Sequence, residues 1–279
     1  MRLRPTLPVF VLATLTLACG EPGEQTPDET SETSGDGDGD PSGDGDGDAS
    51  GDGDGDGDGD PSGDGDGEPL MSASGDAFAF TLPGEDYGRI ANATVSLLED
   101  PNMTTTTDAD GHWVLELGPG PATFVIAADG FPPARTKTFM IEDSVELVTF
   151  QVPNDELFGL LAGVLNLEVD PATCQIVSTV TRVGKSIYDA GAHGEEGAIV
   201  TIDPPLPAEH GPVYFNSAVI PDPSLTETSD DGGILFTNVP PGTYTLHAEK
   251  DGVVFEDVVM QCAAGVLVNA SPPYGLQAL

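Results

Sequence analysis

A long run of glycine and aspartate constrains this chain more than any other feature. Residues 35–69, GDGDGDPSGDGDGDASGDGDGDGDGDPSGDGDGEP, contain no apolar side chain larger than alanine or proline. From Glu21 to Ser74 there is no hydrophobic periodicity, no aromatic residue, no lysine and no arginine. Such a segment buries too little apolar surface to offset the entropy lost on ordering. We therefore expect residues 19–74 to form a disordered stalk, which repulsion between the aspartates extends.

Alternating glycine and aspartate also suggests calcium binding, because carboxylates are calcium ligands. Glycine-rich calcium repeats, however, need a bulky apolar residue in each unit so that successive turns stack, and this run has none. A tight site also needs about six to eight oxygens held in a fixed loop. We expect loose condensation of counter-ions on the stalk, and no metal site or cofactor in the chain.

The charge balance restricts the partners. The 279 residues carry a formal charge of −40, so nucleic acid and anionic lipid surfaces, which are polyanions, are excluded as electrostatic partners. We expect no nucleic-acid binding, and a monomer.

The N-terminus has the three parts of a secretory leader. Arg2 and Arg4 precede an apolar stretch over residues 7–17, which is too short to span a bilayer, and Ala18-Cys19 follows. The segment LTLAC resembles the lipobox of bacterial lipoproteins, although Thr16 stands where a large aliphatic residue is usual. The resemblance implies a signal peptide over residues 1–18, a lipid on Cys19 and a membrane anchor. An ordinary signal peptide cut nearby is the alternative.

The chain has three cysteines, an odd number for an exported protein. If Cys19 carries lipid, Cys174 and Cys262 remain as one candidate disulfide in an oxidising compartment. Two separate buried thiols are the alternative.

The remaining sequence has the pattern of an all-β protein, with short alternating apolar runs between glycine, proline, asparagine and aspartate. The predicted strands of the first half are 77–82, 93–98, 112–117, 122–127, 136–141 and 146–152. Those of the second half are 175–182, 198–202, 212–216, 234–237, 243–248, 253–260 and 265–269. Residues 154–166 predict one linking helix, since Asn154 or Asp155 can cap it and Phe158, Leu161 and Leu165 share one face.

The two halves share an internal repeat. TDADGHWVLELGPGPATFVIAADGF (107–131) has the same pattern as SDDGGILFTNVPPGTYTLHAEKDGV (229–253). Asp110-Gly111 aligns with Asp231-Gly232, where an aspartate that bonds its own backbone and a glycine suit a tight turn. Gly120 aligns with Gly242, and Asp129-Gly130 with Asp251-Gly252. The side chains expected to point inward are Leu115, Leu117, Phe124 and Ile126, with Phe236, Val239, Tyr244 and Leu246 as their counterparts. Trp113, which aligns with Ile234, is expected in the core; a sugar-binding platform is its alternative.

These motifs resemble the carboxypeptidase regulatory-like family, whose pattern is a Thr-Asp-x-x-Gly turn, an alternating strand, a Pro-Gly turn followed by an aromatic residue, and a closing glycine. The second half matches through Pro241, Gly242 and Tyr244, whereas the first has Ala122 in place of the tyrosine. The resemblance implies two tandem Greek-key β-sandwiches of the transthyretin-like or Ig-like type, over residues 75–153 and, with the linking helix, 154–279. It also implies an appended domain without catalytic residues.

The sequence offers no motif for chemistry. The four histidines form no pair with metal-ligand spacing, and no nucleophile elbow or phosphate-binding loop is present. We therefore expect a non-enzymatic lipoprotein at the surface of the outer membrane. Its ligand would be a glycan, held by the aromatic rings of Tyr87, Tyr188 and Tyr214, with the long loop at 184–197 the first place to look. The alternative is a protein-interaction or spacer module of an envelope complex.

Overall fold

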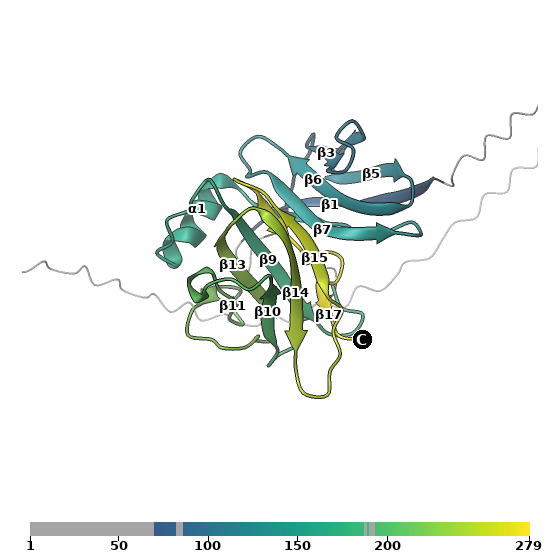
Figure 1. The fold of residues 1–279 in the computed structure, drawn as a ribbon. Coiled ribbons are helices and arrows are strands. Elements are labelled where there is room, and N and C mark those ends of the chain that lie inside the picture. The colour runs from purple at the N-terminus through teal and green to yellow at the C-terminus, as the bar shows by residue number, and fades with distance from the viewer. Residues whose placement is uncertain (1–69, 82–85, 187–188, 190–192) are drawn as a thin grey trace, which may run out of the picture. The chain divides into compact units, whose positions relative to one another are not determined.

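The computed structural model describes residues 70–81, 86–186, 189 and 193–279. All the described residues belong to the compact unit Ser62–Leu279. Cys19 and the glycine-aspartate run therefore lie outside the described residues. The described part is all-β with one α-helix, as the sequence predicts (Figure 1).

The first half is a sandwich of two layers, in which most neighbouring strands are antiparallel. In one layer β1 pairs with β2 and β5, and β8 runs parallel to β1. The other layer has the order β4-β3-β6-β7. The bounds are β1 (Met71–Phe80), β2 (Gly88–Arg89), β3 (Thr94–Leu97), β4 (Thr104–Thr106), β5 (His112–Leu117), β6 (Gly120–Ala127), β7 (Ala134–Ile141) and β8 (Phe150–Pro153).

The core of this sandwich is aromatic. Along β5 exposed and buried residues alternate strictly, so Trp113 points inward with 1% of its surface exposed. Its ring lies 5.2 Å from that of Phe124 and 5.9 Å from that of Phe150, centroid to centroid. The prediction that Trp113 fills the core is confirmed.

The second half repeats this arrangement after the helix. One layer contains β9 and β13, with β11, β12, β16 and β17 beside them, and the other has the order β10-β14-β15. The bounds are α1 (Asp155–Val164), β9 (Cys174–Thr181), β10 (Ile199–Asp203), the short 3₁₀ helix η1 (Ala208–His210), β11 (Val213–Phe215), β12 (Pro221–Asp222), β13 (Gly233–Val239), β14 (Gly242–Glu249), β15 (Val258–Cys262), β16 (Leu267–Asn269) and β17 (Leu276–Gln277). Cys174 and Cys262 form a disulfide that links β9 to β15 across the two layers, which confirms the predicted pair.

The internal repeat is also a repeat of strand pairing. β5 pairs with β1 as β13 pairs with β9, and β6 lies between β3 and β7 as β14 lies between β10 and β15. β8 runs parallel to β1, and β16 runs parallel to β9. The aligned turn glycines Gly111 and Gly232 have φ angles of 75° and 76°, a left-handed conformation that glycine adopts without strain.

A shared strand joins the two halves. β16 runs parallel to β9 on one side and to β7 on the other, so Leu267 is the partner of both Gln175 and Ala134. The result is one ten-stranded sheet that runs through both halves. Leu267 packs in the first core and its neighbour Val268 in the second. Because successive side chains of a strand point to opposite faces, the two remaining layers cover opposite faces of this shared sheet.

Two boundaries can be compared with the sequence. β1 begins at Met71, so residues 71–74, assigned above to the stalk, pair with β5 instead. The side chains of Ser72, Ala73 and Ser74 are too small to show an apolar alternation, although Ala73 is fully buried. The predicted helix is confirmed as α1, whose first turn Asn154 caps by accepting a hydrogen bond from the Leu157 N–H at 2.8 Å.

Candidate functional site

A pocket of about 220 Å³ lies on the shared sheet, where the layer of β1, β5 and β8 ends. On β9, Ile176 and Val180 point into the second core, so the alternate residues Gln175, Val177 and Thr179 point to the opposite face. These alternate residues line the pocket together with residues of β13 and β16. The floor of the pocket is thus the part of the shared sheet that neither sandwich covers.

Helix α1 forms one wall. Its apolar stripe, Phe158, Leu161 and Leu165, lines the pocket, while Leu160 and Val164 on the other side of the helix are 56% and 50% exposed. No residue of α1 is fully buried. The helix is therefore held on the sheet mainly by side chains that also line the pocket.

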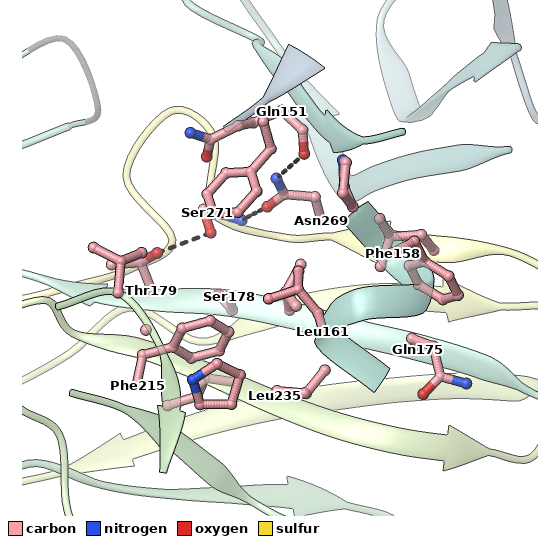
Figure 2. Close-up of a pocket in the computed structure, with 18 of the residues that line it drawn as sticks. Gln151, Phe158, Leu161, Gln175, Ser178, Thr179, Phe215, Leu235, Asn269 and Ser271 are labelled. Atoms are coloured by element: carbon pink, nitrogen blue, oxygen red, sulfur yellow. Dashed lines mark hydrogen bonds between the residues drawn. The ribbon is translucent and has the colours of Figure 1, made fainter. Parts of the chain in front are cut away.

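One end of the pocket is polar. The hydroxyls of Thr179 and Ser271 are hydrogen-bonded at 2.9 Å. The Asn269 amide donates to the Gln151 carbonyl at 3.1 Å and accepts from the Ser271 N–H at 3.1 Å. Figure 2 shows this chain of hydrogen bonds on one side of the pocket and Phe158 on another, with Leu161 between them. The pocket thus has an apolar region and a hydrogen-bonded rim.

Asp231 supplies a carboxylate at the polar end. Its Oδ2 accepts a hydrogen bond from the Gly233 N–H at 3.0 Å. Burial raises the pKa of this carboxyl above its ordinary value of 3.8, the Gly233 hydrogen bond and the nearby His193 oppose the rise, and Asp230 adds to it. A methyl group on Gly233 would lie 2.5 Å from this Oδ2 and 3.0 Å from Cγ of Phe215, so the carboxylate and the aromatic ring are close neighbours.

A close crossing of two glycines holds His193 near Asp231. Gly194 donates a backbone hydrogen bond to the Asp230 carbonyl at 3.0 Å. A methyl group on Gly194 would lie 2.2 Å from the backbone nitrogen of Gly232, which no side chain could tolerate. The aspartate turn of the repeat and the end of the 184–197 loop are therefore in direct backbone contact.

Tyr87 completes this end of the pocket. Its ring packs 6.0 Å from that of Phe78 and 6.4 Å from that of Phe80, both on β1. Burial raises the pKa of the Tyr87 hydroxyl, a hydrogen bond with the Gln151 side chain lowers it, and the Asp231 charge raises it. Tyr87 is still 47% exposed, so a ligand could reach it.

The three tyrosines predicted as ligand contacts lie in different places. Tyr87 lines the pocket. Tyr214, expected as an accessible ligand contact, lies in β11 with 2% of its surface exposed, and its hydroxyl accepts a hydrogen bond from the Val200 N–H at 3.0 Å. That buried bond makes Tyr214 a core residue and removes it from the ligand contacts. Tyr188 lies outside the described residues.

The histidines have separate partners. His112 and His247 contact the carboxylates of Asp76 and Asp257 at 3.2 and 2.8 Å, and His210 contacts the Thr237 carbonyl at 2.9 Å. His193 is the one that lines the pocket. Among the described residues, no three histidine, cysteine, aspartate or glutamate side chains gather as metal ligands would.

Most of the pocket residues could not be predicted from the sequence. Asp231 stands out only as part of a turn motif, and Gln151, Asn269 and Ser271 are ordinary polar residues in or near strands. They meet because β16 lies between the two halves, and a long-range parallel pairing of three residues leaves no local pattern.

Comparison with protein-family models finds a match within the first half of the head. Residues 85–153 match the carboxypeptidase regulatory-like domain. No curated protein sequence matches the chain. In the described residues no helix has the length and hydropathy needed to cross a bilayer.

The similar solved structures include a TIE protein and two pilins, all of low sequence identity. The Bacillus anthracis TIE protein is 15% identical over 75% of this chain and 34% of its own, with a TM-score of 0.22, so this chain corresponds to about a third of it. GBS52, the minor pilin of Streptococcus agalactiae, is 10% identical over 75% and 95%, with a TM-score of 0.24. The shaft pilin SpaA of Lactobacillus rhamnosus GG is 10% identical over 75% and 96%, with a TM-score of 0.22. At these scores the description of the fold rests on the strand pairing given above.

Proposed function

We propose that this protein is a non-enzymatic binding protein of the cell envelope. A lipid on Cys19 would anchor it in the outer membrane, the stalk of residues 19–74 would carry the head outward, and the head would hold a ligand in the pocket beside α1. The leader sequence, with its lipobox-like LTLAC, supports the anchor. The regulatory-like match over residues 85–153 supports a non-catalytic head.

The pocket is the observation that carries the proposal. Mostly apolar walls with a few convergent polar groups are typical of ligand sites in proteins. Residues from both halves line it, including Gln151 of β8, Asp231 and Asn269 of β16. A ligand would therefore bind to the head as a whole.

We further propose that the second half is a second regulatory-like domain. Its strands pair as those of the first half do, and it carries the family's Pro-Gly-x-Tyr turn at residues 241–244. The Tyr244 hydroxyl donates to the Pro240 carbonyl at 3.0 Å, and the ring lies in the second core with 5% exposure. The tyrosine of this motif thus has a structural role in the turn.

Different parts of the pocket support different classes of ligand. Tyr87 supports a glycan, since sugars stack on exposed aromatic rings. The remaining walls are mainly aliphatic, which suits a ligand with an apolar body. The alternative function, a spacer module of an envelope complex, is favoured by the shared sheet, because its β16 pairing couples the two sandwiches.

Metabolic labelling tests the lipid anchor, and probing of intact cells tests the display of the head at the surface. Cells given a labelled fatty acid should incorporate it into the wild-type protein and not into Cys19→Ser. Protease or antibody applied to intact cells should reach the head. Absence of label, or protection of the head in intact cells, would overturn the anchored, displayed form of the proposal.

A glycan array tests the carbohydrate version. Binding that Tyr87→Ala abolishes, while Val114→Ala on the exposed side of β5 leaves it intact, would establish a sugar ligand at this site. If no glycan on the array binds, the carbohydrate version is wrong. A ligand with an apolar body, or the spacer function, then remains.

A further inference from the structure

We propose that the pocket binds a small organic ammonium ion, with its apolar body along α1 and its positive group against Asp231. The inference rests on the proposed function, because it names the ligand class of the same pocket. It depends on the size of the pocket, on the chemistry of its two ends and on the charge around it.

The size of the pocket sets the size of the apolar body. A protein cavity of about 150 Å³ lined by apolar side chains holds benzene. The pocket here has about 220 Å³, which suits a body somewhat larger than one aromatic ring, on the order of ten non-hydrogen atoms. An extended oligosaccharide would exceed this space.

The walls set the chemistry of that body. Phe158 and Leu161 of α1 and its C-cap residue Leu165 line the pocket together with Val177 and Leu235 of the sheet, and Figure 2 shows Leu161 above Leu235. The Gln175 side chain, which also lines this region, is already paired with Asn238, its amide donating at 3.1 Å and its carbonyl oxygen accepting at 3.0 Å. An apolar ligand can therefore contact this region without leaving the polar groups of Gln175 unpaired.

The polar end sets the chemistry of the head group. Asp231 offers a carboxylate whose Oδ2 uses one backbone hydrogen bond. The ring of Phe215 lies beside it, and Tyr87 is close enough to interact with its charge. A carboxylate with aromatic faces is a recurring arrangement for binding ammonium groups, which gain both an ion pair and a cation–π contact.

The charges around the pocket favour a cation and oppose an anion. None of the described residues that line it is lysine or arginine. Within the described part of the chain, Asp230 Oδ1 is buried without a hydrogen-bond partner, and Asp230 acts electrostatically on Asp231. Among the described residues that line the pocket, His193 is the one whose side chain can carry a positive charge. Burial raises the pKa of Asp231, so an ammonium ion there would offset a charge that the fold itself leaves poorly compensated.

Three probes of nearly equal size and different charge test the inference. Phenethylamine, 2-phenylethanol and phenylacetate share a phenyl ring and differ in the head group. Isothermal titration into the purified full chain at neutral pH should show the amine binding about tenfold or more tightly than the alcohol, the usual difference for a hydrogen bond to a charged group. Phenylacetate should bind most weakly.

Matched variants locate the site. Asp231→Asn keeps an oxygen for the Gly233 N–H but removes the charge, so the amine should lose its advantage over the alcohol. Asp110→Asn, the same change at the aligned turn of the first half, should leave binding unchanged because that side chain is exposed and outside the pocket. Ala162→Phe should fill the pocket and weaken all binding, whereas Val164→Phe on the exposed side of α1 should not.

Each adverse outcome is decisive. The inference is overturned if the amine does not bind at millimolar concentration, if amine and alcohol bind equally, or if Asp231→Asn changes nothing. If the lipid label and surface access are present while the amine fails to bind, the ligand class is wrong and the proposed function stands. If the amine binds but the fatty-acid label is absent, the ligand class is right and the lipid-anchored form of the proposed function is wrong.

Discussion

Asp231 is part of a turn, and the burial of its carboxyl group makes ionisation costly in the folded protein. Its pKa in the folded protein lies above the ordinary 3.8, chiefly because of burial. The folded state therefore binds this proton more tightly than the unfolded state does, and the ionised group lowers the free energy of unfolding. That cost is absent below the ordinary pKa and grows as pH rises through the raised pKa.

Asp231→Asn removes this cost, so its effect should depend on pH. The free energy of unfolding of the variant relative to wild type should increase between about pH 3 and about pH 7. Urea denaturation at both pH values measures it, with Asp110→Asn as the exposed control. A relative stability that stays constant or falls over this range would contradict the assignment.

Phe124 tests the first core. It is fully buried and packs against Trp113 and Phe139. Phe124→Ala should lower the free energy of unfolding by about 3–5 kcal/mol, as large-to-small changes in close-packed cores do. Val114→Ala, on the exposed side of β5, should cost less than about 0.5 kcal/mol. Equal losses in chemical denaturation would contradict the packing described here.

Core residues were the most predictable from sequence. Alternation alone identified the inward side chains of the repeat, and the structure confirms them as buried, at 7% exposure or less: Leu115, Leu117, Phe124, Ile126, Phe236, Val239, Tyr244 and Leu246. The burial of Tyr214 was less predictable, although the residue lies in the predicted strand 212–216, because Gly211, Pro212 and Asn216 beside it are typical of loops. Its burial depends on a hydrogen bond to Val200, which belongs to a different strand and leaves no mark near residue 214.

Among the elements, α1 has a weak hold on the fold, since none of its residues is fully buried. Asn154→Ala removes the cap of its first turn and should destabilise the helix by about 1 kcal/mol. The expected result is faster amide hydrogen exchange over residues 155–164 with little change in global stability. Leu160→Ala, at an exposed position of the same helix, is the control. Unchanged exchange in Asn154→Ala would show that the cap contributes nothing.

Local elements were predicted better than their assembly. The helix and most strands follow from periodicity and turn residues, and the repeat predicted that two halves would resemble each other. The position of β16 between β7 and β9 was not predictable, because residues 267–269 show only that a short apolar strand exists there. The pocket depends on that position, so it too could not be read from the sequence.

At the scale of the whole molecule, the shared sheet predicts that the two halves unfold together. The only tryptophan, Trp113, reports on the first core, and the disulfide Cys174–Cys262 braces the second. Reduction of this bond, with a sequence separation of 88 residues, should cost about 4–5 kcal/mol in the chain-entropy model. The unfolding transition seen by Trp113 fluorescence should therefore shift together with that seen by circular dichroism.

Separate transitions would contradict this coupling. If reduction shifts the circular dichroism signal and leaves Trp113 unaffected, the halves unfold independently and β16 does not join them energetically. Reduction of a Cys174→Ala/Cys262→Ala variant, which has no bond to break, is the control for effects of the reductant itself.

The position of Leu267 in the first core also determines when the first half can complete its packing during synthesis. Strands β1–β8 leave the ribosome early, yet the edge of β7 has no neighbour until β16 has been made near the end of the chain. Through that interval the unpaired edge is open to other extended chains. A nascent head would thus benefit from a companion that masks this edge, and the pairing of β16 with β7 makes such protection unnecessary.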